Sequence, residues 1–160
     1  MAEADKKLAV LECPGGGKAT TLGNLLYKCR GIDQPTLERL EKGGKNRYAK
    51  AFNDIQARNE VVHFYTPKNK IVIVEKVCDA DGILIVTPHQ IDKQLQQICN
   101  QLSGMAIQLT RKKALVLVNR LDEFDWSEDT FTDVVRATTA AIQGCGLSKK
   151  RYDMYNSFLR

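Results

Sequence analysis

A glycine-rich turn between a predicted strand and a predicted helix constrains the fold of this chain more than any other feature. The apolar run Leu8–Leu11 predicts a buried strand, and Pro14–Gly17 follows it as a loop. Leucines at helical spacing predict a helix over Lys18–Cys29, and Gly31 is placed to end it. This order is the context of a phosphate-binding loop, because backbone N–H groups at a helix N-terminus attract anions.

Strands and helices are predicted to alternate along most of the remaining chain. Helices are expected over Pro35–Glu41, Asn46–Asn59, Ile91–Leu102 and from the cap Ser127 to about Gln143. Strands are expected over Val61–Tyr65 and Lys70–Val77, which form a hairpin, and over Gly82–Val86, Ala114–Val118 and Tyr152–Leu159. The alternation predicts one α/β domain over residues 1–160, with helices on both faces of a mostly parallel sheet that contains one antiparallel hairpin.

Composition narrows the class of protein. The chain has 160 residues and is 43% hydrophobic, which suits a single soluble domain, and no apolar run is long enough to cross a bilayer. We therefore expect a cytoplasmic protein without a membrane partner. The five cysteines are scattered, which predicts free thiols, mostly buried, and the two histidines make a metal site improbable.

The net charge of +5 leaves several partners open. It favours RNA, acidic lipids or an acidic filament, or it serves solubility alone. The basic groups lack the interleaved aromatic residues that stack on bases, so RNA binding is weakly supported and solubility is the preferred interpretation.

The glycine loop matches a phosphate-binding pattern only in part. The pattern is G-x-x-x-x-G-K-[ST], and Glu12–Ala19 aligns with it. Gly17 and Lys18 are in place. Glu12 replaces the first glycine and brings a negative charge near the position expected for phosphates, while Ala19 lacks the hydroxyl that would bind Mg²⁺.

A second motif follows the predicted strand Ala114–Val118. Asn119-Arg120-Leu121-Asp122 corresponds to the N-K-x-D sequence that reads guanine in GTP-binding proteins. The carboxylate of Asp122 would accept hydrogen bonds from the base edge, and the stem of Arg120 would lie over the ring. The end of a parallel strand is where α/β sheets bind ligands, which strengthens this interpretation.

The run Gly17–Asp33 resembles G-K-S-T-T-T-G-H-L-I-Y-K-C-G-G-I-D of translation elongation factor 1-alpha. Phe64–Lys68 is similar to F-E-T-P-K of that family, and Ala80–Val86 and Val118–Asp122 continue the likeness. The resemblance covers nearly the whole chain. It implies a P-loop GTPase-like three-layer sandwich, without the β-barrel domains of the family.

Two segments depart from the family in ways that matter for chemistry. The family's R-G-I-T-[IV] segment, whose threonine senses the γ-phosphate, has no counterpart between Asn59 and Val61. Glu75–Asp79 stands where the family has D-A-P-G-H, so the γ-phosphate glycine and the water-positioning histidine are missing. The helix that should follow is also missing. The short link to Gly82 must then be extended across the sheet edge, or the strand order must differ.

Three functions follow from the resemblance and the departures. The preferred one is a pseudo-GTPase with no catalytic residues and no cofactor, which serves as a subunit of a larger assembly or of the cytoskeleton. The alternative is a module that binds GDP or GTP without Mg²⁺ and without turnover, and an active GTPase is the least supported. The residues that would contact a nucleotide are Gly15, Gly16, Gly17, Lys18, Ala19, Thr20, Asn119, Arg120, Asp122 and Ser157.

Overall fold

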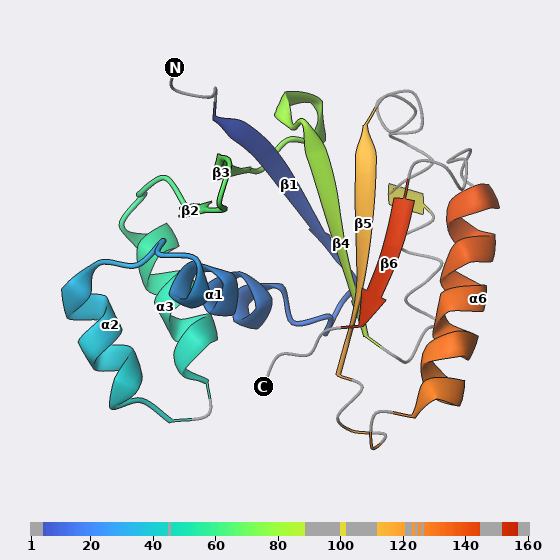
Figure 1. Ribbon diagram of the computed structural model, residues 1–160, viewed down its shortest axis with the longest axis horizontal. Coiled ribbons are helices and arrows are strands. Elements are labelled where there is room, and N and C mark those ends of the chain that lie inside the picture. Colours follow the sequence, from blue (N-terminus) through green and yellow to red (C-terminus); the bar gives the residue numbers. More distant parts are fainter. Residues whose placement is uncertain are drawn as a thin grey trace.

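A six-stranded sheet forms the centre of the computed structural model, which describes residues 5–44, 46–88, 100–101, 112–120, 123, 125, 127–144 and 152–156. In chain order the elements are β1 (Lys6–Glu12), α1 (Lys18–Lys28), α2 (Gln34–Glu41), α3 (Arg47–Ala57), β2 (His63–Tyr65), β3 (Lys70–Val74), the short 3-10 turn η1 (Val77–Asp79), β4 (Gly82–Pro88), β5 (Lys113–Asn119), α6 (Glu128–Gly144) and β6 (Tyr152–Asn156). The strand order is β2-β3-β1-β4-β5-β6. Figure 1 shows α1, α2 and α3 on one side of the sheet and α6 on the other.

The predicted α/β class and most elements are confirmed. All neighbouring strands are parallel except the pair β2 and β3, which forms the predicted antiparallel hairpin. The Ser127 hydroxyl accepts the N–H of Thr130 at 3.3 Å, as expected for the cap of α6. The predicted helix 91–102 lies almost wholly outside the described residues, as do residues 157–159 of the predicted last strand.

One predicted boundary is wrong. The strand expected to continue to Val77 ends at Val74, and the chain then turns through η1. The turn carries Val77 into the core, where it is 5% exposed. Burial of that side chain beneath the turn, rather than strand pairing, accounts for its apolar character.

Alternate side chains of the central strands pack on opposite faces. Val10 and Leu84 lie on the face covered by α1 and α3, where they meet Leu22 and Phe52. The two helices approach closely at Gly23, where an added Cβ would lie 1.9 Å from the Tyr48 carbonyl oxygen. This face holds α1, and therefore the end of the glycine loop, in a fixed position against β1 and β4.

A short link can connect β3 to β4 without a helix because these two strands are staggered along β1. Val74, at the end of β3, is level with Ala9, and Gly82, at the start of β4, is level with Leu8. The link 75–81 therefore needs to cross only from one side of β1 to the other, roughly 10 Å from strand to strand. It does not have to return along the length of a strand. The link is a turn that buries Val77 and Ala80 and leaves its other residues exposed, rather than an extended segment.

A lysine braces this short crossover. The Lys112 ammonium donates hydrogen bonds to the carbonyl oxygens of Val77 at 2.6 Å and Cys78 at 3.0 Å, and also to that of Ala80. The Val77 carbonyl also accepts the Ala80 N–H at 3.2 Å, so the ammonium adds to the backbone bond that closes η1 there. This role was not predicted from the sequence, in which Lys112 counts only among the basic residues that favour solubility.

The described cysteines are free thiols, as predicted, but they are not mostly buried. Cys13 is buried, Cys29 is half-buried and Cys78 is exposed, while positions 99 and 145 lie outside the described residues. Cys13 contacts the Thr87 hydroxyl oxygen at 3.5 Å. Within the described ranges, no helix has the length and apolar character needed to cross a membrane.

Candidate functional site

The glycine loop lies at the carboxyl end of β1 and leads directly into α1. Gly17 is the N-cap of α1, has a φ of 88°, and would place an added Cβ only 2.6 Å from the Asn119 amide nitrogen. Gly16 lies against β4, where a Cβ would be 2.7 Å from the Val86 carbonyl oxygen. Glycine is therefore favoured at Gly17 by its left-handed conformation and required at Gly16 by the space against the backbone of β4. The loop has the tight backbone course that the sequence predicted.

The Glu12 side chain folds into this loop. Its Oε1 atom accepts the backbone N–H of Gly17 and the backbone N–H of Lys18, each at 2.9 Å. These two donors lie at the positive end of the α1 dipole, where an anion is stabilised. A carboxylate oxygen of the chain itself thus occupies the position at which a phosphate oxygen would be bound.

Other loop residues also differ from a working phosphate site. The methyl group of Ala19 packs against the apolar cluster beneath α1 and supplies no hydroxyl. Thr20 is exposed at the surface, while the neighbouring Thr21 is buried and its hydroxyl oxygen has no hydrogen-bond partner among the residues that the structure describes. Lys18 is half-buried, and its ammonium forms no ion pair or hydrogen bond with the described residues.

Asn119, at the end of β5, is joined to the glycine loop. Its amide nitrogen donates to the Gly16 carbonyl oxygen at 2.8 Å, and its amide oxygen accepts the Arg120 N–H at 2.9 Å. The structure therefore brings two predicted motifs together although 103 positions separate them in sequence. The bond fixes the loop to the end of β5, across β4 from β1, and needs no ligand.

The base-reading side of the site is only partly described. Arg120 has a φ of 63°, and its guanidinium forms a salt bridge with Glu123 at 2.5 Å. The arginine stem is thus held toward its own turn. Asp122 and Ser157, predicted to contact a guanine base, lie outside the described residues.

Two cavities lie near the first three helices. One, of about 620 Å³, borders Lys18 at the glycine loop, and the other, of about 320 Å³, lies away from the loop between α2 and α3. The larger cavity is bounded by Asn59, Glu60 and Glu75, where the chain lacks the two family segments described above. Among the residues that the structure describes, no group of three acidic, histidine or cysteine side chains is arranged to hold a metal.

Asp79 and Asp81 belong to the polar turn between β3 and β4. The Asp81 carboxylate accepts the Lys7 N–H at 2.8 Å and so ties the crossover to β1. Both residues serve the turn between β3 and β4. Because Ala19 stands in place of a hydroxyl, the loop does not fit the Mg²⁺ ion that this fold implies, and Glu12 accepts two of the N–H groups that a phosphate would use.

Comparison with known proteins confirms the resemblance read from the sequence. Elongation factor 1-alpha of Blastobotrys adeninivorans is 28% identical over 166 residues, which cover 84% of this chain and 36% of that protein. The Saccharomyces cerevisiae protein is 27% identical over the same shares of the two chains. No family model matches this chain. The chain is a weak homologue of the GTP-binding region and spans little more than a third of these relatives.

Solved structures confirm the fold. The S. cerevisiae Ski7 GTPase-like domain, bound to GDP and inorganic phosphate, matches with a TM-score of 0.75 and 14% identity over 97% of this chain and 43% of that chain. Sup35 complexed with GDP matches with a TM-score of 0.69 and 16% identity over 96% of this chain and 37% of that chain. The fold is that of a P-loop GTPase domain.

Proposed function

We propose that this chain is a pseudo-GTPase that acts through protein contacts, as a subunit of a larger assembly, and does not hydrolyse GTP. The observation that carries the proposal is the Glu12 carboxylate in the glycine loop, where it accepts the N–H groups of Gly17 and Lys18. A nucleotide phosphate needs the same donors. It would also meet a negative charge at close range, which raises the free energy of the bound state.

The chemistry of turnover supports the same conclusion. Phosphoryl transfer requires a metal clamp, a positioned water molecule and groups that contact the γ-phosphate. Ala19 offers no metal ligand, and the segment Glu75–Asp79 contains neither the glycine nor the histidine that the resembled family uses. In their place the link is a short crossover turn held by Lys112.

A role as a protein scaffold is consistent with the hydrogen bonds that Glu12 and Asn119 make to the glycine loop. The Asn119–Gly16 bond and the Glu12 bonds stabilise the loop without a ligand, so the domain keeps its surface in one conformation. A partner then meets a surface that does not depend on nucleotide state. We propose a protein partner in the cytoplasm, with a filament or another large complex as its setting.

The experiment compares the natural chain with Glu12→Gly and Glu12→Gln. Nucleotide extracted from the purified proteins is identified by chromatography, and GDP and GTP binding are then titrated by calorimetry with and without Mg²⁺. The natural chain is expected to carry no nucleotide and to bind with a Kd weaker than about 1 mM. Glu12→Gly, which frees both N–H groups, is expected to bind at least about tenfold more tightly.

Glu12→Gln is the matched control, because it keeps an acceptor oxygen of the same reach and removes only the charge. It should gain less affinity than Glu12→Gly. GTP hydrolysis by the natural chain above the rate without protein would refute the pseudo-GTPase proposal outright.

A second function, guanine-nucleotide binding without turnover, is favoured by one observation. The Asn119 amide lies at the loop, and the Lys18 ammonium remains unpaired among the described residues, so part of the site persists. The solved structures of Sup35 and Ski7, which have this fold, hold GDP. Guanine-selective binding that weakens in Asp122→Ala would establish this function in place of the first.

A further inference from the structure

We propose that the pocket between α2 and α3 binds an acidic peptide segment that carries an apolar anchor residue. The inference rests on the proposed protein-interaction function and names the surface and the partner class. The pocket has a volume of about 320 Å³, which suits one or two side chains. Its lining residues are Thr36, Arg39, Leu40, Gly43, Gly44, Asn46, Arg47, Lys50, Ala51 and Asp54.

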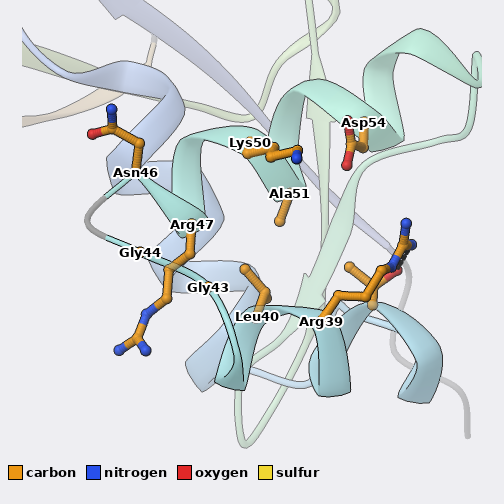
Figure 2. Close-up of a pocket in the computed structure, with 10 residues that line it drawn as sticks. Arg39, Leu40, Gly43, Gly44, Asn46, Arg47, Lys50, Ala51 and Asp54 are labelled. Carbon is orange, nitrogen blue, oxygen red and sulfur yellow. Dashed lines mark hydrogen bonds between the residues drawn. The ribbon is translucent and has the colours of Figure 1, made fainter.

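The floor of the pocket is apolar. Figure 2 shows Leu40 of α2 and Ala51 of α3 pointing toward each other between the helices. They are 5% and 3% exposed, so they form a floor that cannot move without disturbing the helix contact. Gly44 leaves the pocket open on one side, since an added Cβ there would meet nothing within 4 Å. An aliphatic side chain of a partner could enter by that side.

The rim carries an excess of positive charge. Arg39, Arg47 and Lys50 line the pocket, and among the described lining residues one carboxylate, that of Asp54, opposes them. Figure 2 shows Arg39 and Arg47 reaching out on opposite sides of the Leu40–Ala51 pair. Across the part of the chain that the structure describes, none of the three cations forms an ion pair with a carboxylate.

Two of these cations are held in place by neutral partners. An Arg39 Nη atom donates to the Thr36 hydroxyl at 3.1 Å, and the Arg47 guanidinium lies 4.9 Å from the centre of the Tyr48 ring. Their positions are therefore set before any partner arrives, which lowers the entropy lost on binding. Oppositely charged groups on the partner would gain attraction without breaking an existing salt bridge.

The chemistry favours a peptide over RNA. The pocket presents an aliphatic floor, and its described lining residues include no aromatic ring on which a base could stack. The nearby ring of Tyr48 is already covered by Arg47 and by Tyr27. Acidic side chains flanking one leucine or phenylalanine match both the rim and the floor.

The test uses a fluorescein-labelled peptide of six glutamates around a central leucine, measured by fluorescence anisotropy. One comparison peptide has serine in place of leucine, and another has lysines in place of the glutamates. We expect the first peptide to bind at least about tenfold more tightly than either comparison. Arg39→Glu and Lys50→Glu should each weaken its binding by about tenfold or more.

Arg136→Glu on α6 is the matched charge reversal at a distant exposed site and should leave peptide binding unchanged. If a reversal impairs folding, Arg39→Gln and Lys50→Gln replace it, with a smaller loss expected. The inference is overturned if no acidic peptide binds at about 1 mM, if the reversals have no effect, or if a uridine oligonucleotide binds this face and the peptides do not. The nucleotide titration above reports on the proposed function separately, so either result can fail alone.

Discussion

Glu12 stands at a position where a phosphate-binding loop has glycine, and its side chain makes the contacts that a phosphate would make. The sequence predicted its charge near the phosphate position. It could not predict that the carboxylate would bond to Gly17 and Lys18, because that depends on side-chain torsions chosen in the folded loop. Asn119 is similar, since its predicted role was guanine binding and its observed contact is with Gly16.

The first prediction concerns the stability that Glu12 supplies. Glu12→Ala removes the acceptor of two N–H groups at the start of α1, as loss of a helix cap does, and should lower the free energy of unfolding by about 1–2 kcal/mol. Glu12→Gln, which keeps an acceptor oxygen, should lose less. Urea unfolding measures both. Equal stability of Glu12→Ala and the natural chain would contradict the observed hydrogen bonds.

The helices and strands were largely predictable, because apolar spacing follows directly from the two periods of backbone structure. The helix α2 was expected from Pro35 and begins at Gln34, while α3 lies inside its predicted bounds. The end of β3 was not predictable. An apolar Val77 extends a strand pattern equally well whether it pairs or turns into the core, and only the tertiary contact distinguishes the two.

The second prediction concerns the crossover between β3 and β4. Lys112→Met removes the ammonium that bonds to the carbonyls of Val77, Cys78 and Ala80, and should lower the free energy of unfolding by about 1.5–3 kcal/mol. Lys113→Met is the matched control, because that neighbour is exposed at the start of β5, and its effect should stay within about 0.5 kcal/mol. Similar effects of both substitutions on urea unfolding would show that Lys112 has no bracing role.

The third prediction concerns the N-terminus of α2. The pKa of Asp33 lies below its ordinary value of 3.8, mainly because the Thr36 hydroxyl forms a hydrogen bond with the carboxylate. Burial acts in the opposite direction but is the weaker effect, and the positive charge of Arg58 lowers the pKa further. The resulting stabilisation is complete above the ordinary pKa and is lost as the pH falls through the lower, folded-state pKa.

Asp33→Asn should therefore flatten the loss of stability between about pH 4 and more acidic solutions, and Thr36→Val should act in the same direction. Urea midpoints recorded across this pH range test the prediction. A pH dependence in both variants equal to that of the natural chain would show that Asp33 does not contribute.

At the scale of the whole molecule, the three-layer arrangement followed from the alternation of strands and helices, and the strand order did not. The sequence left open how a short link could replace a crossover helix. The answer is the stagger of β3 and β4 along β1, together with a turn that buries Val77 and Ala80. Stagger is a property of strand pairing across the sheet, and local sequence carries little information about it.

The fold and the loop together support one account: a domain that keeps the GTPase architecture and fills its phosphate position with its own carboxylate. Nuclear magnetic resonance tests this most directly, through the backbone amide signals of Gly17 and Lys18 during titration with pyrophosphate. The account predicts that both signals stay unchanged in the natural chain and shift in Glu12→Gly. Saturable shifts of both signals in the natural chain would contradict it, because they would show that a phosphate displaces Glu12 from the loop.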